Sequence, residues 1–414
     1  MQNSAESQDI TIPLGVFRRR CLLFVVPLLL LAAPAIGILQ TSGESLADVD
    51  EIIEHSDDQQ FLVGYAYNDR NYGYLKYRRL TSLSRQSVVA LGSSRVLGFR
   101  EEMFSGSFYN AGYTIVSPWD FRTFLGLIPD ARLPEVLILG LDQFMFNAAN
   151  NRDRPPKEST VWTTKPRNDL QAACQLIPDV YKDLVRGRLP IGPVLTHATG
   201  ISPSTIPVGL NGLVNAQGFR NDGSLVYGSQ VRLLLKSDPA ARDFHFARTL
   251  NRVKRGGTRF NHGDMVDSAA VDEIDQLLSY CRERNVQVVA FLPPYADAVW
   301  DAMQESGNYE YTLHIESALQ DSFDRHECEL YAFHRMSDCD SSDLEAIDGF
   351  HAGGNVYLKM LIHMLSEGSV LNKHASLVQL QHDKQHVVDR YTCYQEPTHS
   401  KSRLASAESR HVLQ

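Results

Sequence analysis

The chain has 414 residues, of which 43% are hydrophobic and 21% are charged, and its formal net charge is −9. This length suits one large domain or two modest ones, and the composition is typical of a folded globular protein rather than of a disordered or multi-pass membrane protein. The negative charge argues against nucleic-acid binding, and the six cysteines show neither a CxxC pair nor the Cys/His spacing of a zinc site.

The first 40 residues indicate the compartment. Arg18, Arg19 and Arg20 directly precede an uncharged apolar run at 21–39. A basic flank keeps its own side of a membrane helix in the cytoplasm, so we predict a cytoplasmic segment 1–20 and a transmembrane signal anchor 21–39. Ala33-Pro34-Ala35 also fits a signal-peptidase site, so a cleaved signal peptide is the alternative. Both interpretations export the rest of the chain.

After an acidic and then aromatic segment at 40–84, interpreted as a stalk and lead-in, short apolar strands alternate with helical segments. This alternation is the pattern of a parallel sheet covered on both faces. The predicted strands are 87–91, 107–110, 135–140, 286–292 and 329–333. The predicted helices are 95–103, 117–127, 267–284, 296–305, 310–323 and 355–365.

Two regions depart from this rhythm. Residues 151–263 are rich in proline and glycine and are predicted to form an irregular insertion subdomain with helices near 168–186 and 238–253. Residues 367–414 are polar and predict a partly disordered tail, with the disorder beginning at Pro397. Cys328 and Cys339 are close enough in sequence to form a disulfide in an oxidising compartment, but buried free thiols are the preferred interpretation.

Two polar motifs carry residues suited to nucleophilic catalysis. Gly92-Ser93-Ser94-Arg95 follows the first predicted strand, where a serine at the head of a helix lies near N–H groups that stabilise an oxyanion. Asp348-Gly349-Phe350-His351 precedes the last helix, and a carboxylate at this spacing orients an imidazole that takes a proton from a serine. Alone, the first motif is more often a helix cap and the second a solvated turn.

Two further motifs also fall at carboxyl ends of predicted strands, where open α/β sheets place their active sites. Asn110-Ala111-Gly112 follows the second strand, and Gly140-Leu141-Asp142-Gln143 follows the third. Each alone fits ordinary turn chemistry. Arg95, beside the serine motif, is expected at the surface or facing a phosphate. Asn261-His262-Gly263-Asp264 is too sparse to predict a metal site.

The order of these four motifs resembles the SGNH (GDSL-like) hydrolase superfamily across residues 85–366. The resemblance implies that Ser94 is the nucleophile and that Asp348 and His351 complete its triad. It also implies a flavodoxin-like three-layer α/β sandwich with a mainly parallel five-stranded sheet, here carrying the irregular insertion. The membrane-anchored exported branch, with the D-alanine transfer protein and the alginate O-acetyltransferases, is similar in topology and in its first-motif serine.

The chain departs from the family pattern at two oxyanion positions. In the second motif Asn110 and Gly112 match, but the family's last glycine is Ile115, which keeps only its backbone N–H. In the third motif the usual asparagine is Asp142, whose carboxylate repels an oxyanion unless it is protonated or turned away. Gln143 is then the alternative amide donor. Gly112, Asp142, Gln143 and Asn110 are therefore the expected oxyanion and substrate-binding residues.

The resemblance and the predicted export imply a membrane-tethered serine acyl-esterase or O-acyltransferase that acts on an envelope or secreted glycan. Its substrate is an acylated glycan or acyl donor, and the insertion 151–263 is the expected place for acceptor recognition. The mechanism needs neither cofactor nor metal, and a multi-pass membrane acyltransferase partner is expected by analogy. The alternative is a catalytically silent relative that scaffolds or binds polysaccharide in a secretion complex.

Overall fold

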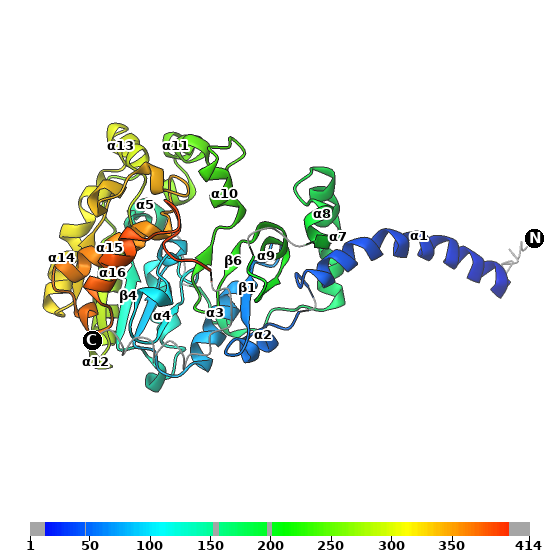
Figure 1. The fold of residues 1–414 in the computed structure, drawn as a ribbon, viewed down its shortest axis with the longest axis horizontal. Coiled ribbons are helices and arrows are strands. Elements are labelled where there is room, and N and C mark those ends of the chain that lie inside the picture. The colour runs from blue at the N-terminus through cyan, green and yellow to red at the C-terminus, as the bar shows by residue number, and fades with distance from the viewer. Residues whose placement is uncertain (1–12, 46, 152–156, 197–200, 397–414) are drawn as a thin grey trace, which may run out of the picture.

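The computed structural model describes residues 13–45, 47–151, 157–196 and 201–396. Its main sheet has five parallel strands in the order β3-β2-β4-β8-β9 (Figure 1). These strands are β2 (Val88–Leu91), β3 (Phe108–Asn110), β4 (Val136–Gly140), β8 (Gln287–Leu292) and β9 (Glu329–Ala332). In chain order this is the 2-1-3-4-5 arrangement of flavodoxin-like folds, so the predicted fold class is confirmed.

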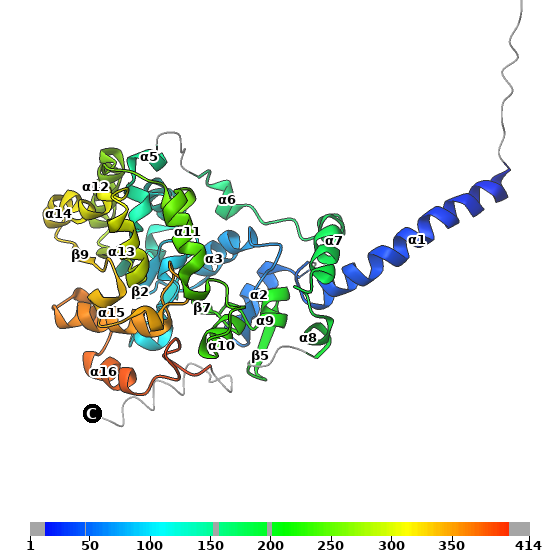
Figure 2. The ribbon, with the colours of Figure 1, turned by 90° about the horizontal axis from the view of Figure 1, so that it is seen from above.

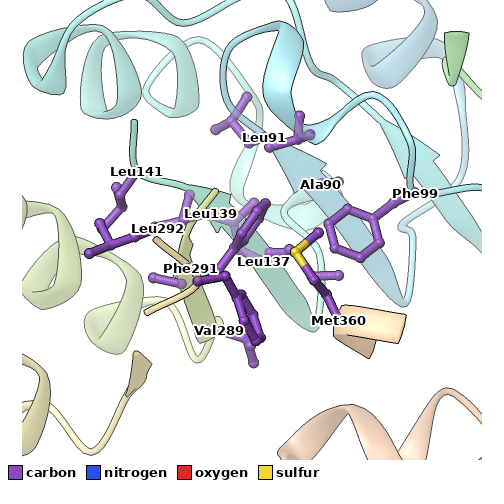
Figure 3. Packing of buried hydrophobic residues seen from close by; sticks show 14 of the residues in the cluster. Ala90, Leu91, Phe99, Leu137, Leu139, Leu141, Val289, Phe291, Leu292 and Met360 are labelled. Atoms are coloured by element: carbon purple, nitrogen blue, oxygen red, sulfur yellow. The ribbon is translucent and has the colours of Figure 1, made fainter. Parts of the chain in front are cut away.

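Helices cover both faces of this sheet, which explains why its central strands are apolar on both sides. Figure 2 shows α12 and α14 on one side of the sheet and α15 on the other, and α4 packs against α12. The main helices are α4 (Pro118–Leu125), α12 (Ser268–Glu283), α13 (Asp297–Glu305), α14 (Ile315–Arg325) and α15 (Gly354–Ser366). In the core, Leu137, Val289 and Met360 come together from two strands and α15 (Figure 3).

A second, four-stranded sheet was not predicted. Its order is β5-β1-β6-β7, with β1 (Gln60–Val63), β5 (Thr205–Val208), β6 (Gly218–Phe219) and β7 (Leu225–Val226). Strand β1 runs parallel to β5 and antiparallel to β6. The segment 40–84, expected to be a stalk, therefore joins the insertion 151–263 in one sheet. Its helices α2 (Val49–His55) and α3 (Asn71–Ser82) contact each other and bury apolar side chains in the same small core.

The insertion also carries several helices. They are α6 (Thr160–Thr163), α7 (Leu170–Val185), α8 (Ile191–Thr196), α9 (Leu210–Asn215), α10 (Ser229–Leu235) and α11 (Ala247–Arg255), and the short α5 (Ala148–Asn151) directly precedes the insertion. The helix predicted at 168–186 corresponds to α7. The helix predicted at 238–253 corresponds only in part to α11, because His245 and Phe246 have positive φ and end any helix that approaches from the N-terminal side.

Helix α1 (Leu14–Thr41) projects from the body of the molecule (Figure 1). It is long and apolar enough to cross a membrane, or to be a signal sequence. Its C-terminal end belongs to the fold, because Ala35 and Leu39 are fully buried in a cluster with Val180 of α7 and Leu210 of α9. Residues 1–12 of the predicted cytoplasmic segment lie outside the described residues.

The first part of the expected tail is folded. Residues 367–396 contain the 3₁₀ turn Val370–Lys373 and helix α16 (Leu377–Gln385), and Leu371 and Leu380 are buried in the main core. Glu396 forms ion pairs with Arg100 and Arg220. Pro397 and the predicted disorder after it lie outside the described residues. All six cysteines are free.

Candidate active site

Ser94 lies directly beyond the carboxyl end of β2. This strand pairs with β3 on one side and with β4 on the other, so the chain order reverses beside it. In open α/β sheets such a switch point, at the carboxyl ends of the strands, is where ligands bind. The serine motif predicted from the sequence therefore stands at the location that the fold favours for a site.

The structure brings Ser94, His351 and Asp348 together. Ser94 Oγ lies 2.9 Å from His351 Nε2, although the two residues are 257 positions apart in the chain. His351 Nδ1 lies 2.9 Å from both carboxylate oxygens of Asp348. Ser94 and Asp348 are each only 8% exposed, so little bulk water competes for these hydrogen bonds. The three groups form one continuous chain from hydroxyl to imidazole to carboxylate.

The Asp348 carboxylate fixes the proton positions in this chain. Burial raises the pKa of Asp348, but the His351 ring and the backbone N–H groups of Phe350 and His351 outweigh burial and hold this pKa well below its usual range. An ionised carboxylate only accepts hydrogen bonds, so His351 Nδ1 carries the proton that points at it. In the neutral ring Nε2 is then an acceptor, and Ser94 donates its hydroxyl proton toward it.

The insertion holds the Asp348–His351 turn in place. Asp243, just before α11, accepts hydrogen bonds from the backbone N–H of Gly349 at 3.1 Å and from Thr249 Oγ1 at 2.6 Å. Gly349 is also needed for packing, since a Cβ atom there would lie 2.8 Å from the Thr249 side chain. The insertion thus supports the candidate site directly. No sequence motif marked Asp243.

The predicted helix at 95–103 is wrong. The chain forms two short 3₁₀ turns instead, Ser94–Val96 and Glu101–Met103. The Asn110 side chain explains the interruption, because its Nδ2 donates to the carbonyls of Val96 at 2.8 Å and Phe99 at 3.0 Å, which a continuing helix would use. The expected contribution of a helix dipole at Ser94 therefore does not apply.

The four expected oxyanion residues are engaged elsewhere. Asn110, Asp142 and Gln143 are fully buried, and Asn110 Oδ1 accepts the N–H of Gly112 at 2.9 Å. Gln143 Nε2 donates to the carbonyl of Pro293 at 2.8 Å. These hydrogen bonds serve the turns beyond β3 and β4, whereas Asp142 Oδ2 has no hydrogen-bond partner among the described residues.

Two backbone N–H groups near the nucleophile differ in their availability. The N–H of Ile115 donates to the carbonyl of Gly92 at 3.3 Å. The N–H of Ser94 makes no hydrogen bond within the described part of the chain. Because an oxyanion hole needs donors that no protein group already occupies, the Ser94 N–H is the group best placed to serve as one.

Arg95 was expected at the surface or facing a phosphate, but the structure buries it. It is 1% exposed, and its Nη1 donates to Asp142 Oδ1 at 3.2 Å and to Gln143 Oε1 at 2.9 Å. Its Nη2 donates to the carbonyl of Pro293 at 2.8 Å. Its guanidinium also lies 4.3 Å from the centre of the Tyr295 ring. Arg95 therefore compensates the Asp142 charge and links the carboxyl ends of β2, β4 and β8.

Among the described residues, no group of three or more His, Cys, Asp and Glu side chains is arranged to hold a metal ion. His262, in the sparse motif noted in the sequence, bonds the carbonyl of Val253 through Nε2 at 3.0 Å. In comparisons with known proteins, the chain matches no protein-family model, and no curated protein matches its sequence.

Proposed function

We propose that the protein is an exported, membrane-tethered serine acyl-esterase or O-acyltransferase of the SGNH type that acts on a glycan. The observation that carries the proposal is the continuous hydrogen-bonded chain Ser94–His351–Asp348, with both of its links at 2.9 Å. An arrangement of this kind activates a serine for attack on an acyl carbonyl, on whichever fold it occurs.

In the proposed mechanism His351 Nε2 takes the Ser94 proton as Oγ forms a bond to the acyl carbonyl carbon. The Ser94 N–H donates to the oxyanion, and Asp348 stabilises the imidazolium. His351 then gives the proton to the leaving alkoxide, which departs and leaves an acyl-enzyme. A water molecule or a sugar hydroxyl attacks this ester after His351 removes its proton, and the released Ser94 oxygen recovers that proton.

The proposed location rests on the apolar part of α1 and on the three arginines that precede it within the same helix. Arg18, Arg19 and Arg20 on the N-terminal side favour a cytoplasmic N-terminus, with the sheet domain on the opposite side of the membrane. Substrates in that compartment include acylated glycans and membrane-delivered acyl donors, and a multi-pass acyltransferase partner fits the transfer reaction. The glycan itself is inferred from this location and from the family resemblance.

A catalytically silent scaffold is the second candidate. It is favoured by the bonding of Asn110 and Gln143, whose amide groups are used inside the fold. Asp142, at the position where the family has asparagine, is likewise paired with Arg95. This alternative retains the fold and the tether, but it predicts no turnover at Ser94.

The test is turnover of a chromogenic acetyl ester by the full-length protein in detergent. We expect Ser94→Ala to lower kcat by about 10³-fold or more, because the acyl-enzyme no longer forms. Ser366→Ala, at the end of α15, is the matched control, since its hydroxyl bonds only to its own helix. Full activity in Ser94→Ala contradicts the mechanism, and a folded wild-type protein without turnover supports the scaffold.

A further inference from the structure

A concentration of positive charge lies in the insertion, next to the candidate site. Residues 242–259 contain six cationic side chains and one carboxylate, Asp243, in a chain whose net charge is −9. We use the name arginine patch for four of them, which neighbour the site or one another: Arg242, Arg248, Arg252 and Arg259. Lys254 and Arg255 of α11 add to the same local charge.

The arginine patch has no ion-pair partner among the residues that the structure describes. In the described part of the chain, none of the four arginines forms an ion pair with a carboxylate, whereas half of the other described arginines do. Asp243 is committed to Gly349, to Thr249 and to the backbone N–H of Arg248. Arg242 and Arg248 are exposed, and Arg252 and Arg259 are half-buried.

Aromatic rings connect the patch to the triad. The Arg259 guanidinium lies 5.4 Å from the centre of the Phe350 ring, which is itself 5.1 Å from the His351 ring. The Arg252 guanidinium lies 4.8 Å from the Phe260 ring, which packs against Phe350. The half-buried arginines are therefore within one or two side chains of the imidazole.

The patch also acts on the other side of the nucleophile. Tyr113 donates its backbone N–H to the carbonyl of Ser93 at 3.0 Å, so it borders the serine turn. Burial raises the pKa of Tyr113, and the positive charges of Arg259 and Arg242 oppose that rise. Arginines from the insertion thus act electrostatically on residues at both ends of the Ser94–His351 pair.

The arginines also repel one another. Burial lowers the pKa of Arg252, and its neighbours Arg259 and Arg248 lower it further, although the carboxylates of Asp348 and Asp243 partly oppose them. Like charges that outnumber the nearby carboxylates disfavour the folded state, and a bound anion relieves this repulsion. Guanidinium groups suit that purpose, because their planar fork matches carboxylate and phosphate oxygens.

We propose that the arginine patch is a subsite for an anionic group, carboxylate or phosphate, on the glycan whose ester is processed at Ser94. This inference deepens the proposed function and rests on it for the reaction, but binding itself does not require turnover. The acceptor is then a polyanion, held so that its neutral hydroxyls or esters reach the serine. The arginine patch attracts the negative charge of such an acceptor, whereas the rest of this acidic protein repels it.

The test is calorimetric titration of the full-length protein in detergent with oligogalacturonate, with its fully methyl-esterified form and with short polyphosphate. We expect at least one of the two anions to bind, with affinity falling as salt rises, and the neutral methyl ester to bind at least about tenfold more weakly. Binding of oligogalacturonate alone identifies a carboxylate subsite, and binding of polyphosphate alone identifies a phosphate subsite.

Variants locate the binding. Arg248→Gln combined with Arg259→Gln is expected to weaken anion binding by about tenfold or more, with partial recovery in the Arg→Lys pair. Arg282→Gln, on α12 at the opposite side of the molecule in Figure 1, is the matched control and is expected to keep the affinity. If the variant with Arg248→Gln and Arg259→Gln does not fold, it is replaced by Arg242→Gln with Arg248→Gln, because both of these side chains are exposed.

The outcomes separate this proposal from the catalytic one. Ser94→Ala is expected to bind the anion as well as the wild type does. Anion binding without turnover supports the anionic subsite and contradicts the proposed enzymatic function. Turnover without anion binding supports the enzymatic function and overturns the subsite. Equal affinity for the methyl ester, or for the double arginine variant in its folded state, overturns the subsite.

Discussion

At the scale of single residues, Arg95 and Asp142 have a structural role that their sequence motifs did not predict, because they form a buried ion pair. Arginine is rarely fully buried, so the residue after Ser94 was expected at the surface. Its partners are a carboxylate beyond β4 and the Pro293 carbonyl beyond β8, which only the sheet topology brings together. The carboxylate that appeared unfavourable for an oxyanion is the same group that this arginine compensates.

Replacing Arg95 tests this account of the pair. Arg95→Met is expected to lower the free energy of unfolding by about 3–5 kcal/mol, because Asp142 is left buried without a cation. Urea denaturation measures the change, with Arg282→Met as the exposed control. A loss no larger than that of the control shows that the pair does not stabilise the fold.

The Ser94–His351–Asp348 set was predicted at the level of single residues, because the order and spacing of its motifs are visible in the sequence. The bonding of Asn110 and Gln143 was not, because it depends on where their amides point after folding. Asp243 was missed for the same reason. A lone aspartate in an irregular segment carries no local sign that it holds a turn more than 100 positions away.

Asp348→Asn isolates the role of the carboxylate. The neutral amide neither holds the Nδ1 proton in place nor stabilises the imidazolium, so kcat is expected to fall by roughly 10³–10⁴-fold with little change in KM. Steady-state kinetics on the acetyl ester provide the measurement, and circular dichroism verifies that the variant is folded. Unchanged kcat means that Asp348 only shapes its turn.

At the scale of elements, the local hydrophobic pattern was enough to predict those helices and strands whose own sequence shows which side chains are buried. Strands β2 and β4 are continuous apolar runs, β8 is apolar from Val288 onward, and α12 has a regular apolar face, so these elements were visible in the sequence. The second sheet was missed because its strands have two to four residues, and β1 finds its neighbours more than 140 positions later. Such pairing leaves no local signature.

Lys76 of α3 joins these two parts and makes their stability depend on pH. Its Nζ donates to the carbonyls of Asn110, at 2.9 Å, and Gly223, and burial lowers its pKa to about 7. In the unfolded chain the lysine pKa is about 10.4. Between these values the unfolded state binds more protons, so the contribution of Lys76 to stability rises with pH from about 7 to 10.

Lys76→Met should remove this contribution. We expect the free energy of unfolding of the wild type, measured relative to that of Lys76→Met, to increase between pH 7 and pH 9.5. Lys236→Met, at an exposed lysine, is the control and is expected to show no such trend. A difference that stays constant with pH means that Lys76 is protonated in the folded protein.

At the scale of the whole molecule, α1, the second sheet and the main sheet follow one another along the long axis (Figure 1). The end of α1 is buried against α7 and α9, so the insertion connects the apolar helix to the domain that carries Ser94. The same insertion holds the Asp348 turn through Asp243 and carries the arginine patch. The insertion, which has an irregular sequence pattern, therefore contacts the apolar helix α1, supports the candidate site and carries the arginine patch.

Cys174 of α7 provides a test of the proposed orientation, because its thiol is exposed. In spheroplasts of a bacterial expression host, a membrane-impermeant maleimide is expected to label this thiol. Cys174→Ser, the matched control, should lose the label. Labelling that appears only after the membrane is broken places the domain on the cytoplasmic side and contradicts the proposed export.

The central claim is that Ser94 is an activated nucleophile, and a fluorophosphonate probe tests it most directly. After treatment of the folded full-length protein, we expect peptide mass spectrometry to find the adduct on Ser94, in the wild type but not in His351→Ala. A folded wild-type protein that takes up no probe, or that carries the adduct on another serine, contradicts the claim.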